Sequence, residues 1–173
     1  MSRLAQGLQE RRHVLGFHPS SRGFGWILFE DSRSLLDWGT VDLRADKRNT
    51  RTLVRLDAIL DRYRPDVLAM ESHDGVRVRR CLRIQKLYLA VERRAERRYI
   101  IVHRVSRSQI ENSPRMNGAK TRQEVAIAVA ACITALRPHL PKPRQIWVGE
   151  RSAMRLFCAA ACAIAYLDGK QDR

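Results

Sequence analysis

The chain has 173 residues, which suits one domain with a sizeable core and leaves little room for two. A hydrophobic fraction of 45% excludes a largely disordered chain, and the longest near-apolar runs, 125–136 and 156–167, fall short of the ~20 residues of a membrane-spanning helix. The formal charge is +15 and 28 of the 33 basic residues are arginine, which favours a polyanionic partner. An arginine-rich genome would produce the same excess without any ligand.

Residues 1–13, MSRLAQGLQERRH, lack the apolar core of a signal peptide, and we expect them to form a flexible N-terminal segment. Residues 14–168 are predicted to form the single domain, and residues 169–173 a short tail. The four cysteines have no CxxC spacing and lie in apolar helical patterns. We therefore expect reduced thiols, in a cytoplasmic protein that has no membrane partner.

The stretch from Val14 to Glu30, VLGFHPSSRGFGWILFE, predicts a hairpin, because two apolar runs flank a Pro-Ser-Ser-Arg-Gly turn. His18 stands at the end of the first run, where a polar side chain would point into a cleft at the edge of the sheet. Ser34 to Leu43 predicts a third strand with a bulge at Gly39. These three strands would form an antiparallel meander.

The pattern changes at Thr50, where apolar residues recur every three or four positions and predict an amphipathic helix that ends at Pro65. Asp66 to Glu71, DVLAME, is a short apolar run that ends in a carboxylate, which is typical of a strand buried on both faces. A strand, a helix and a strand in succession imply a right-handed crossover. The fourth strand is therefore expected to lie parallel to the first.

The second half of the chain predicts one more strand among helices. A basic helix follows Gly75 and runs to about Arg98, and a polar segment without periodicity, residues 106–117, is expected to be an exposed loop. The other predicted elements are a strand from Tyr99 to Val105, a helix from about Gly118 to Leu136, and a last helix from about Ser152 to Leu167. Small residues in the last helix would allow close packing on a sheet. The order of elements indicates an α/β fold.

His18 and Glu71 end neighbouring strands in this arrangement, so their side chains are expected to share one site at the carboxyl ends of the strands. The stretches VLGFHPSSRGFGWILFE and DVLAMES resemble the first and fourth strands of the RuvC-like branch of the RNase H-like superfamily, typically "lGiDPG…tGwgv" and "d.vaiE". Residues 121–167 resemble the family ending "TK.eIA…L.p.lP..R..W.sED.RM.lFDAlalA". The resemblance implies an RNase H-like fold, a five-stranded mixed sheet flanked by helices, with strands one to three antiparallel and strands four and five parallel.

The resemblance also implies the chemistry of structure-specific endonucleases such as Holliday junction resolvases, in which carboxylates hold two Mg²⁺ ions for phosphodiester hydrolysis. The catalytic positions carried over to this chain are Glu71, Glu150, His18 and Cys158. His18 stands where the family has its first-strand Asp, Cys158 stands at the Asp of "FDA", and Arg151 replaces the acid that usually follows Glu150. Neutral imidazole offers one lone pair and a thiol is a soft ligand, so we expect an eroded two-metal site in which only Glu71 and Glu150 remain as metal ligands.

Each of these residues also has a structural interpretation. His18 can form a hydrogen bond at a strand end, Glu71 can pair with an arginine, and Cys158 and Cys162 can fill space on one helical face. An active protein would use Mg²⁺ or Mn²⁺, and an eroded one would need no cofactor. A substitute Zn²⁺ site made by His18, Glu71 and Cys158 is the least favoured alternative.

Basic residues near the predicted site form a second candidate feature, because rows of arginine contact phosphates with a steep salt dependence and little sequence information. The candidate nucleic-acid contacts are Arg77, Arg79, Arg80, Arg83, Lys86, Arg107, Arg115, Lys120 and Arg122. The structural alternative is a solvated helix face, although like charges with few acids between them repel one another. The expected partner is branched or duplex DNA or structured RNA, and the resemblance allows a homodimer.

Three functions remain open at the level of sequence. The first is a RuvC-like nucleic-acid-binding protein with an eroded nuclease centre. The second is an active metal-dependent endonuclease that uses Glu71 and Glu150 with an unusual or single metal. The third is a non-catalytic scaffold whose charge serves solubility or an acidic protein partner.

Overall fold

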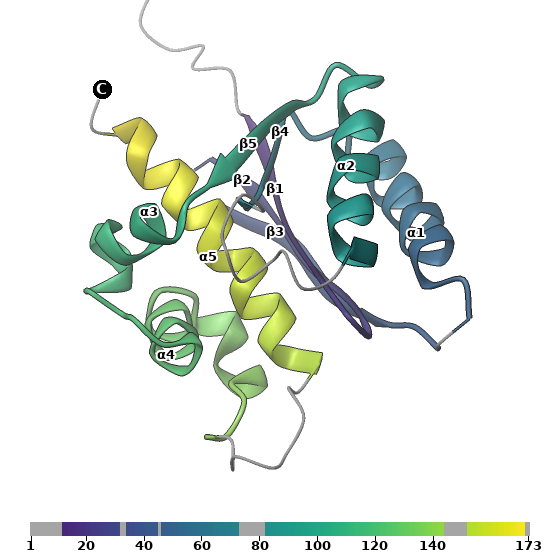
Figure 1. Ribbon diagram of the computed structural model, residues 1–173. Coiled ribbons are helices and arrows are strands. Elements are labelled where there is room, and N and C mark those ends of the chain that lie inside the picture. Colours follow the sequence, from purple (N-terminus) through teal and green to yellow (C-terminus); the bar gives the residue numbers. More distant parts are fainter. Residues whose placement is uncertain (1–11, 32–33, 45, 73–81, 144–151, 172–173) are drawn as a thin grey trace, which may run out of the picture.

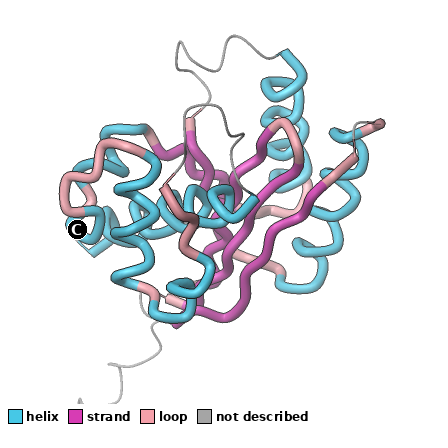
Figure 2. Tube along the Cα trace, turned by 90° about the horizontal axis from the view of Figure 1, so that it is seen from below, coloured by secondary structure: helices cyan, strands magenta, loops and turns pink. Residues whose placement is uncertain are grey.

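The computed structural model describes residues 12–31, 34–44, 46–72, 82–143 and 152–171. These residues form a five-stranded sheet with helices on both faces (Figures 1 and 2). The strands are β1 (His13–Ser20), β2 (Gly23–Glu30), β3 (Ser34–Asp42), β4 (Val67–Glu71) and β5 (Ile101–Val105), in the order β3-β2-β1-β4-β5. β1 and β3 are antiparallel to β2, which lies between them, and β4 is parallel to both β1 and β5. The predicted mixed sheet is confirmed.

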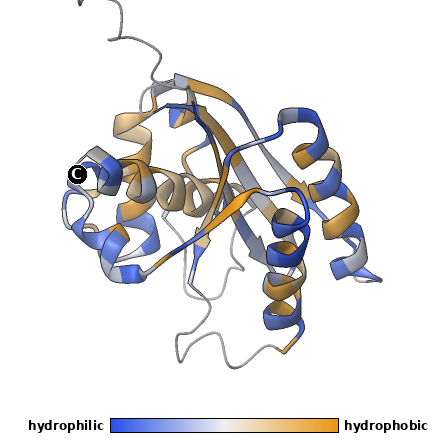
Figure 3. Cartoon of the chain, turned by 90° about the horizontal axis from the view of Figure 1, so that it is seen from above, coloured by the Kyte–Doolittle hydropathy of each residue, from blue (hydrophilic) through white to orange (hydrophobic). Residues whose placement is uncertain are grey.

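Two helices cover one face of the sheet, and the C-terminal part of the chain covers the other (Figure 1). The first pair is α1 (Arg48–Tyr63) and α2 (Leu82–Glu96), each with an apolar and a hydrophilic side (Figure 3). The opposite face carries α3 (Arg107–Asn112), the 3-10 helix η2 (Pro114–Met116), α4 (Arg122–Cys132), the 3-10 helix η3 (Thr134–His139) and α5 (Ser152–Gln171). The fold therefore has three layers, with the sheet in the middle.

Alternation along the strands divides the buried residues between two cores. Leu15 of β1 lies in the core beneath α1 and α2, whereas Val14 lies in the core beneath α5. The same alternation places His18 on the α5 side of β1, four residues after Val14. Glu71 follows Ala69 by two residues in β4, and Ala69 belongs to the α5 core. Both candidate site residues therefore face the C-terminal helix.

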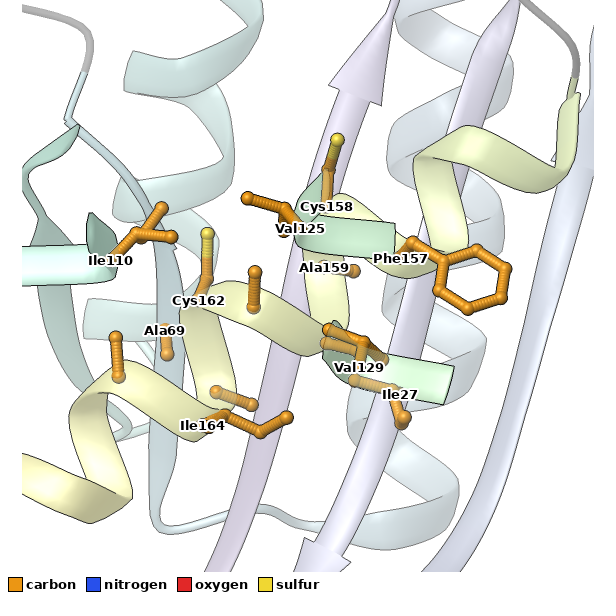
Figure 4. Packing of buried hydrophobic residues seen from close by; sticks show 14 of the residues in the cluster. Ile27, Ala69, Ile110, Val125, Val129, Phe157, Cys158, Ala159, Cys162 and Ile164 are labelled. Atoms are coloured by element: carbon orange, nitrogen blue, oxygen red, sulfur yellow. The ribbon is translucent and has the colours of Figure 1, made fainter. Parts of the chain in front are cut away.

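α5 lies unusually close to β1 and β2 because two glycines face it. A Cβ atom added at Gly16 would lie 2.3 Å from the carbonyl oxygen of Ala159, and one added at Gly25 would lie 2.3 Å from the carbonyl carbon of Arg155. Small residues of α5 allow this approach, as predicted, and fill the core on this face (Figure 4). By length and composition α5 could cross a membrane, but 83% of the apolar window is buried, so core packing explains its composition.

Residues 106–117 do not form the exposed loop that the sequence analysis predicted. They form α3 and η2, and Ile110 and Met116 are buried. A capping box between Ser106 and Gln109 begins α3. A helix of less than two turns is too short for its hydrophobic periodicity to be recognised.

Two smaller predictions are also wrong. The irregularity between β2 and β3 lies at Leu28 and Phe29 rather than at Gly39. Gly39 instead makes room for an indole, because a Cβ atom there would lie 2.9 Å from Nε1 of Trp26. The helix expected to continue to Leu136 ends earlier, where α4 gives way to η3.

Candidate functional site

His18 lies inside β1, opposite Gly25 of β2, and the strand continues past it to Ser20. The prediction that His18 ends the strand is therefore two residues short, and the residue is 5% exposed. The turn after Ser20 begins two residues later than the apolar run suggested, because Pro19 and Ser20 still pair with β2. The imidazole is thereby buried between the sheet and the helices above it.

Glu71 is the last residue of β4, as predicted, and the pairing of Phe17 with Met70 brings it beside His18. Nδ1 of His18 lies 3.8 Å from Oε2 of Glu71. The Glu71 side chain is 30% exposed, whereas that of His18 is 7% exposed. The expectation that these two residues share one site is therefore met, with the carboxylate on the solvent side.

The imidazole of His18 is neutral at physiological pH. Burial, and then the positive charges of Arg122 and Arg155, lower its pKa to about 3. Nδ1 forms no hydrogen bond within the described parts of the chain. A separation of 3.8 Å would suit an ion pair if the ring were protonated, but burial and the two arginines oppose protonation, so a neutral ring contacts a carboxylate here.

Two cysteines of α5 lie close to this pair. Cys158 and Cys162 are buried and project from the same side of the helix (Figure 4). Burial raises the pKa of the Cys162 thiol, and Glu71 and Cys158 raise it further. Tyr88 of α2, which the sequence analysis assigned only to a buried stripe, is also a neighbour. Burial, followed by the effects of Cys162 and Glu71, raises the pKa of its phenol.

Arg155 of α5 was not singled out from the sequence, yet it is 4% exposed and lies near His18. Nη1 donates a hydrogen bond to the carbonyl oxygen of Val41 at 3.0 Å, and Nε donates to that of Ser152 at 3.3 Å. Nη2 pairs with the carboxylate of Asp42. Arg155 therefore joins α5 to the end of β3. An arginine inside an otherwise apolar helix was the signal that could have found it.

The structure of Thermus thermophilus RuvC in complex with Holliday junction substrate aligns over 93% of this chain and 96% of that chain, with a TM-score of 0.67 and 20% identity. A second Thermus thermophilus RuvC structure aligns over 92% of this chain and 96% of that chain, with a TM-score of 0.62 and 20% identity. The chain has a RuvC-like fold. No family model and no curated protein matches the sequence.

The resemblance to RuvC implies a pair of Mg²⁺ ions, but the described side chains of this site do not fit them. Mg²⁺ takes oxygen ligands, whereas the site offers the carboxylate of Glu71, a neutral imidazole and buried thiols. The positive charges of Arg122 and Arg155 further disfavour a divalent cation. Glu150 and Arg151, which the resemblance also assigns to the site, lie outside the described residues.

The substitute zinc site also lacks support in the described part of the chain. No group of three or more His, Cys, Asp or Glu side chains there could hold a metal ion. His18, Glu71 and Cys158 therefore do not converge as a Zn²⁺ site would require. What the RuvC-like fold brings together here is a neutral ring and one carboxylate, flanked by arginines.

Several predicted nucleic-acid contacts are held by the protein itself. Arg83 donates hydrogen bonds to Oδ1 of Asn49 at 2.7 Å and to the carbonyl oxygen of Ser21 at 3.3 Å, which joins α2 to α1 and to the β1–β2 turn. The positions that lie outside the described residues are Arg77, Arg79 and Arg80. Their contact with nucleic acid stays a prediction.

Arg107 and Arg115 are likewise engaged in the fold. Nε of Arg107 lies 2.9 Å from Oε1 of Glu111 in an ion pair. Nε of Arg115 donates a hydrogen bond to Oδ1 of Asp168 at 2.6 Å, and the buried carboxylate of Asp168 also accepts a hydrogen bond from Ser113. The Arg107–Glu111 pair lies within α3, whereas the contacts to Asp168 hold Ser113 and η2 against α5.

The remaining predicted contacts are exposed. Lys86 lies on the outer side of α2, and Lys120 and Arg122 flank Thr121, which caps α4. Arg122 is close enough to His18 to lower the pKa of the imidazole. The start of α4 therefore presents positive charge beside the His18–Glu71 pair.

Proposed function

We propose that this protein is a RuvC-like nucleic-acid-binding protein that recognises branched or duplex DNA and whose two-metal nuclease site is eroded. The observation that carries this proposal is the neutral, buried imidazole of His18 in contact with Glu71. This ring stands at the position where the family resemblance predicts a metal-binding carboxylate. It supplies neither the charge nor the second oxygen that a bridging ligand needs.

The ligand class is supported by charge and by structural similarity. The net charge of +15 favours a polyanion, and the similar RuvC structure from Thermus thermophilus contains a Holliday junction substrate. With a single described carboxylate at the site, a phosphate could approach Lys120 and Arg122 without a bridging metal ion. Binding would then depend on phosphate contacts.

The first experiment measures binding of a synthetic four-way DNA junction by fluorescence anisotropy in the presence of a chelator. We expect binding that weakens between about 50 and about 200 mM salt, by about tenfold for every two phosphates contacted. Lys120→Ala should reduce both the affinity and the salt slope. Lys142→Ala removes the same kind of charge from another exposed position that is not one of the predicted contacts, and it serves as the matched control.

The second experiment introduces carboxylates at the two positions where the family resemblance predicts aspartate. His18→Asp combined with Cys158→Asp should gain Mg²⁺-dependent cleavage of the junction if the site is an eroded two-metal centre. Adding Glu71→Gln to this double variant should abolish the gain, because Glu71 is the carboxylate that the site retains.

Two outcomes would favour the other functions. Cleavage by the unmodified protein with Mn²⁺ that disappears in Glu71→Gln would identify an active endonuclease and contradict the erosion. Failure to bind any DNA or RNA at low salt would contradict the proposed function and favour a scaffold role.

A further inference from the structure

A second feature lies at the other end of the sheet, where β1, β4 and β5 begin and where α1 and α2 end (Figure 1). An open cavity of about 1070 Å³ is found there. Its lining includes Arg12, Arg64, Asp66, Arg97, Tyr99 and Ile101. His18 lies five residues further along β1 than His13, which corresponds to roughly 17 Å, so this cavity is separate from the His18–Glu71 site.

The carboxylates around this cavity already have ion-pair or hydrogen-bond partners within the protein. Arg98 pairs with Asp57 at 3.1 Å and with Asp61 at 2.9 Å, and Arg94 also pairs with Asp57. The carboxylate of Asp66 accepts a hydrogen bond from the backbone N–H of His13 at 2.8 Å. These interactions join α1 to α2 and β1 to the start of β4. They leave no carboxylate of the lining without a partner.

Three arginines of the lining, unlike these acids, have no hydrogen-bonding or ion-pair partner in the described part of the chain. The guanidinium groups of Arg12, Arg64 and Arg97 form no hydrogen bond or ion pair with any residue that the structure describes. All three residues are exposed. Arg64 lies near enough to Asp61 to help lower the pKa of that carboxyl group, after the larger effect of the Arg98 hydrogen bond. The cavity therefore carries three guanidinium groups that no hydrogen bond or ion pair within the described residues engages.

Tyr99 is the second unusual element of the lining. Its side chain is 96% exposed, and its backbone has a φ of 58°, a left-handed conformation that favours glycine. The N–H groups of Tyr99 and Ile100 donate hydrogen bonds to the carbonyl oxygens of Glu96 and Ala95, which fixes the turn after α2. A residue with a large side chain is strained in this conformation, and no packing of the ring against the core compensates for the strain.

We propose that this cavity binds a short segment of single-stranded nucleic acid, with an unpaired base stacked on Tyr99 and adjacent phosphates on Arg64 and Arg97. The choice of ligand class rests on the proposed function, whereas the site itself rests on the cavity, the open arginines and the exposed ring. Base stacking on aromatic side chains within a positively charged groove is the general mode of single-strand binding. A duplex does not fit this arrangement, because the faces of paired bases are covered by their neighbours.

The experiment measures anisotropy of a fluorescein-labelled oligothymidine of about ten nucleotides. Tyr99→Gly suits the left-handed backbone, so it preserves the fold while it removes the ring. We expect it to weaken binding about 5- to 100-fold, and Tyr99→Phe to retain binding, because stacking requires the ring and not the hydroxyl. Arg97→Ala should also weaken binding, whereas Arg93→Ala, which removes the same charge one turn earlier, in α2 and outside the cavity lining, should change it less than about twofold.

Ultraviolet crosslinking of the same oligonucleotide, followed by peptide mass spectrometry, gives a second readout. A crosslink on the peptide that contains Tyr99 supports the proposal. Oligothymidine binding that is equal in Tyr99→Gly and the unmodified protein overturns it, as does crosslinking confined to other peptides.

Failure of this proposal is distinguishable from failure of the proposed function. If junction binding depends on Lys120 but oligothymidine binding does not depend on Tyr99, only the single-strand site is contradicted. If oligothymidine binds through Tyr99 but the junction does not bind, only the proposed function is contradicted. If neither ligand binds, both are wrong.

Discussion

Arginines at the two ends of the sheet have opposite environments. At the carboxyl ends of β1 and β4, Arg155 is buried, bonded to β3, and lowers the pKa of a neighbouring histidine. At the amino ends, the acids of α1 are taken up by Arg94 and Arg98, and Arg64 and Arg97 remain open beside a cavity. One end is a packed polar site and the other an exposed cationic one.

This difference shows that arginine content alone does not identify a binding surface. What decides the role of each arginine is whether a carboxylate or carbonyl oxygen lies within reach in the folded chain. Arg115, a predicted contact, is held by buried Asp168, whereas Arg97, which was not a predicted contact, has no such partner among the described residues.

The largest expected effect concerns the close approach of α5 at the packed end. Gly25→Ala would place a Cβ atom 2.3 Å from the carbonyl carbon of Arg155 and 2.4 Å from the backbone nitrogen of Leu156. Backbone atoms cannot rotate away, so α5 must shift, and we expect a loss of about 3 kcal/mol or more in the free energy of unfolding. Urea unfolding followed by circular dichroism measures it.

Gly169→Ala is the matched control for this substitution. Gly169 also lies in α5, and nothing lies within 4 Å of the added Cβ atom. Alanine favours the helix, so we expect stability to be unchanged or to rise by up to about 1 kcal/mol. If Gly169→Ala lost as much stability as Gly25→Ala, close packing of α5 on β2 would not explain the loss in Gly25→Ala.

Arg155→Met tests the hydrogen bonds of the packed end, because methionine keeps the apolar part of the side chain and removes the guanidinium group. The carbonyl oxygens of Val41 and Ser152 each lose a donor. Asp42 is 69% exposed, so losing its ion pair adds little. We expect a loss of about 2 kcal/mol in urea unfolding and a rise in the pKa of His18, observed by NMR titration. A pKa that does not move would contradict the proximity of Arg155 to the imidazole.

Stability should also fall at mildly acidic pH because of His18. Its pKa is about 3 in the folded protein and 6.5 in the unfolded chain, so the unfolded state binds more protons between these values. Protonation of the unfolded chain therefore destabilises the fold as the pH falls below about 6.5. The expected loss from this group is about 2 kcal/mol between about pH 7 and about pH 5.

His18→Gln removes this titration and should flatten the decline in stability over the same pH range. The groups that face the imidazole, Glu71 of β4, Arg122 of α4 and Arg155 of α5, stay in place in this variant. His103 contributes a smaller effect of the same sign, because burial and then Lys170 lower its pKa. An identical pH dependence in His18→Gln and the unmodified protein would show that His18 is not the buried neutral group described here.

The layout of the sheet could be predicted from the sequence because its signals are local. Alternation and turn residues predict the hairpin of β1 and β2, and the strand–helix–strand order predicts that β4 lies parallel to β1. The proximity of His18 and Glu71 then follows from the two strands being neighbours. The burial of His18 does not follow, because it depends on where β1 stops pairing with β2.

The partners of the charged residues could not be predicted in the same way. Arg155 is bonded to a strand more than a hundred positions earlier in the chain, and Arg115 to an acid near the C-terminus. Such pairings depend on how the helices are placed over the sheet, and an arginine side chain can reach many sites. The left-handed backbone of Tyr99 was also unpredictable, since tyrosine has no preference for that conformation.

The smallest expected effect compares two arginines at the open end, Arg94 in the last turn of α2 and Arg97 just after the helix. Arg94 pairs with Asp57, but Arg98 contacts the same carboxylate, so Arg94→Ala should lower the free energy of unfolding by less than about 1 kcal/mol. Arg97→Ala removes a side chain with no partner in the described structure, so its effect on unfolding should lie within about 0.5 kcal/mol. Oligothymidine binding should show the reverse order, with the larger loss in Arg97→Ala. If the two variants lost binding equally, net charge rather than the cavity would explain the affinity.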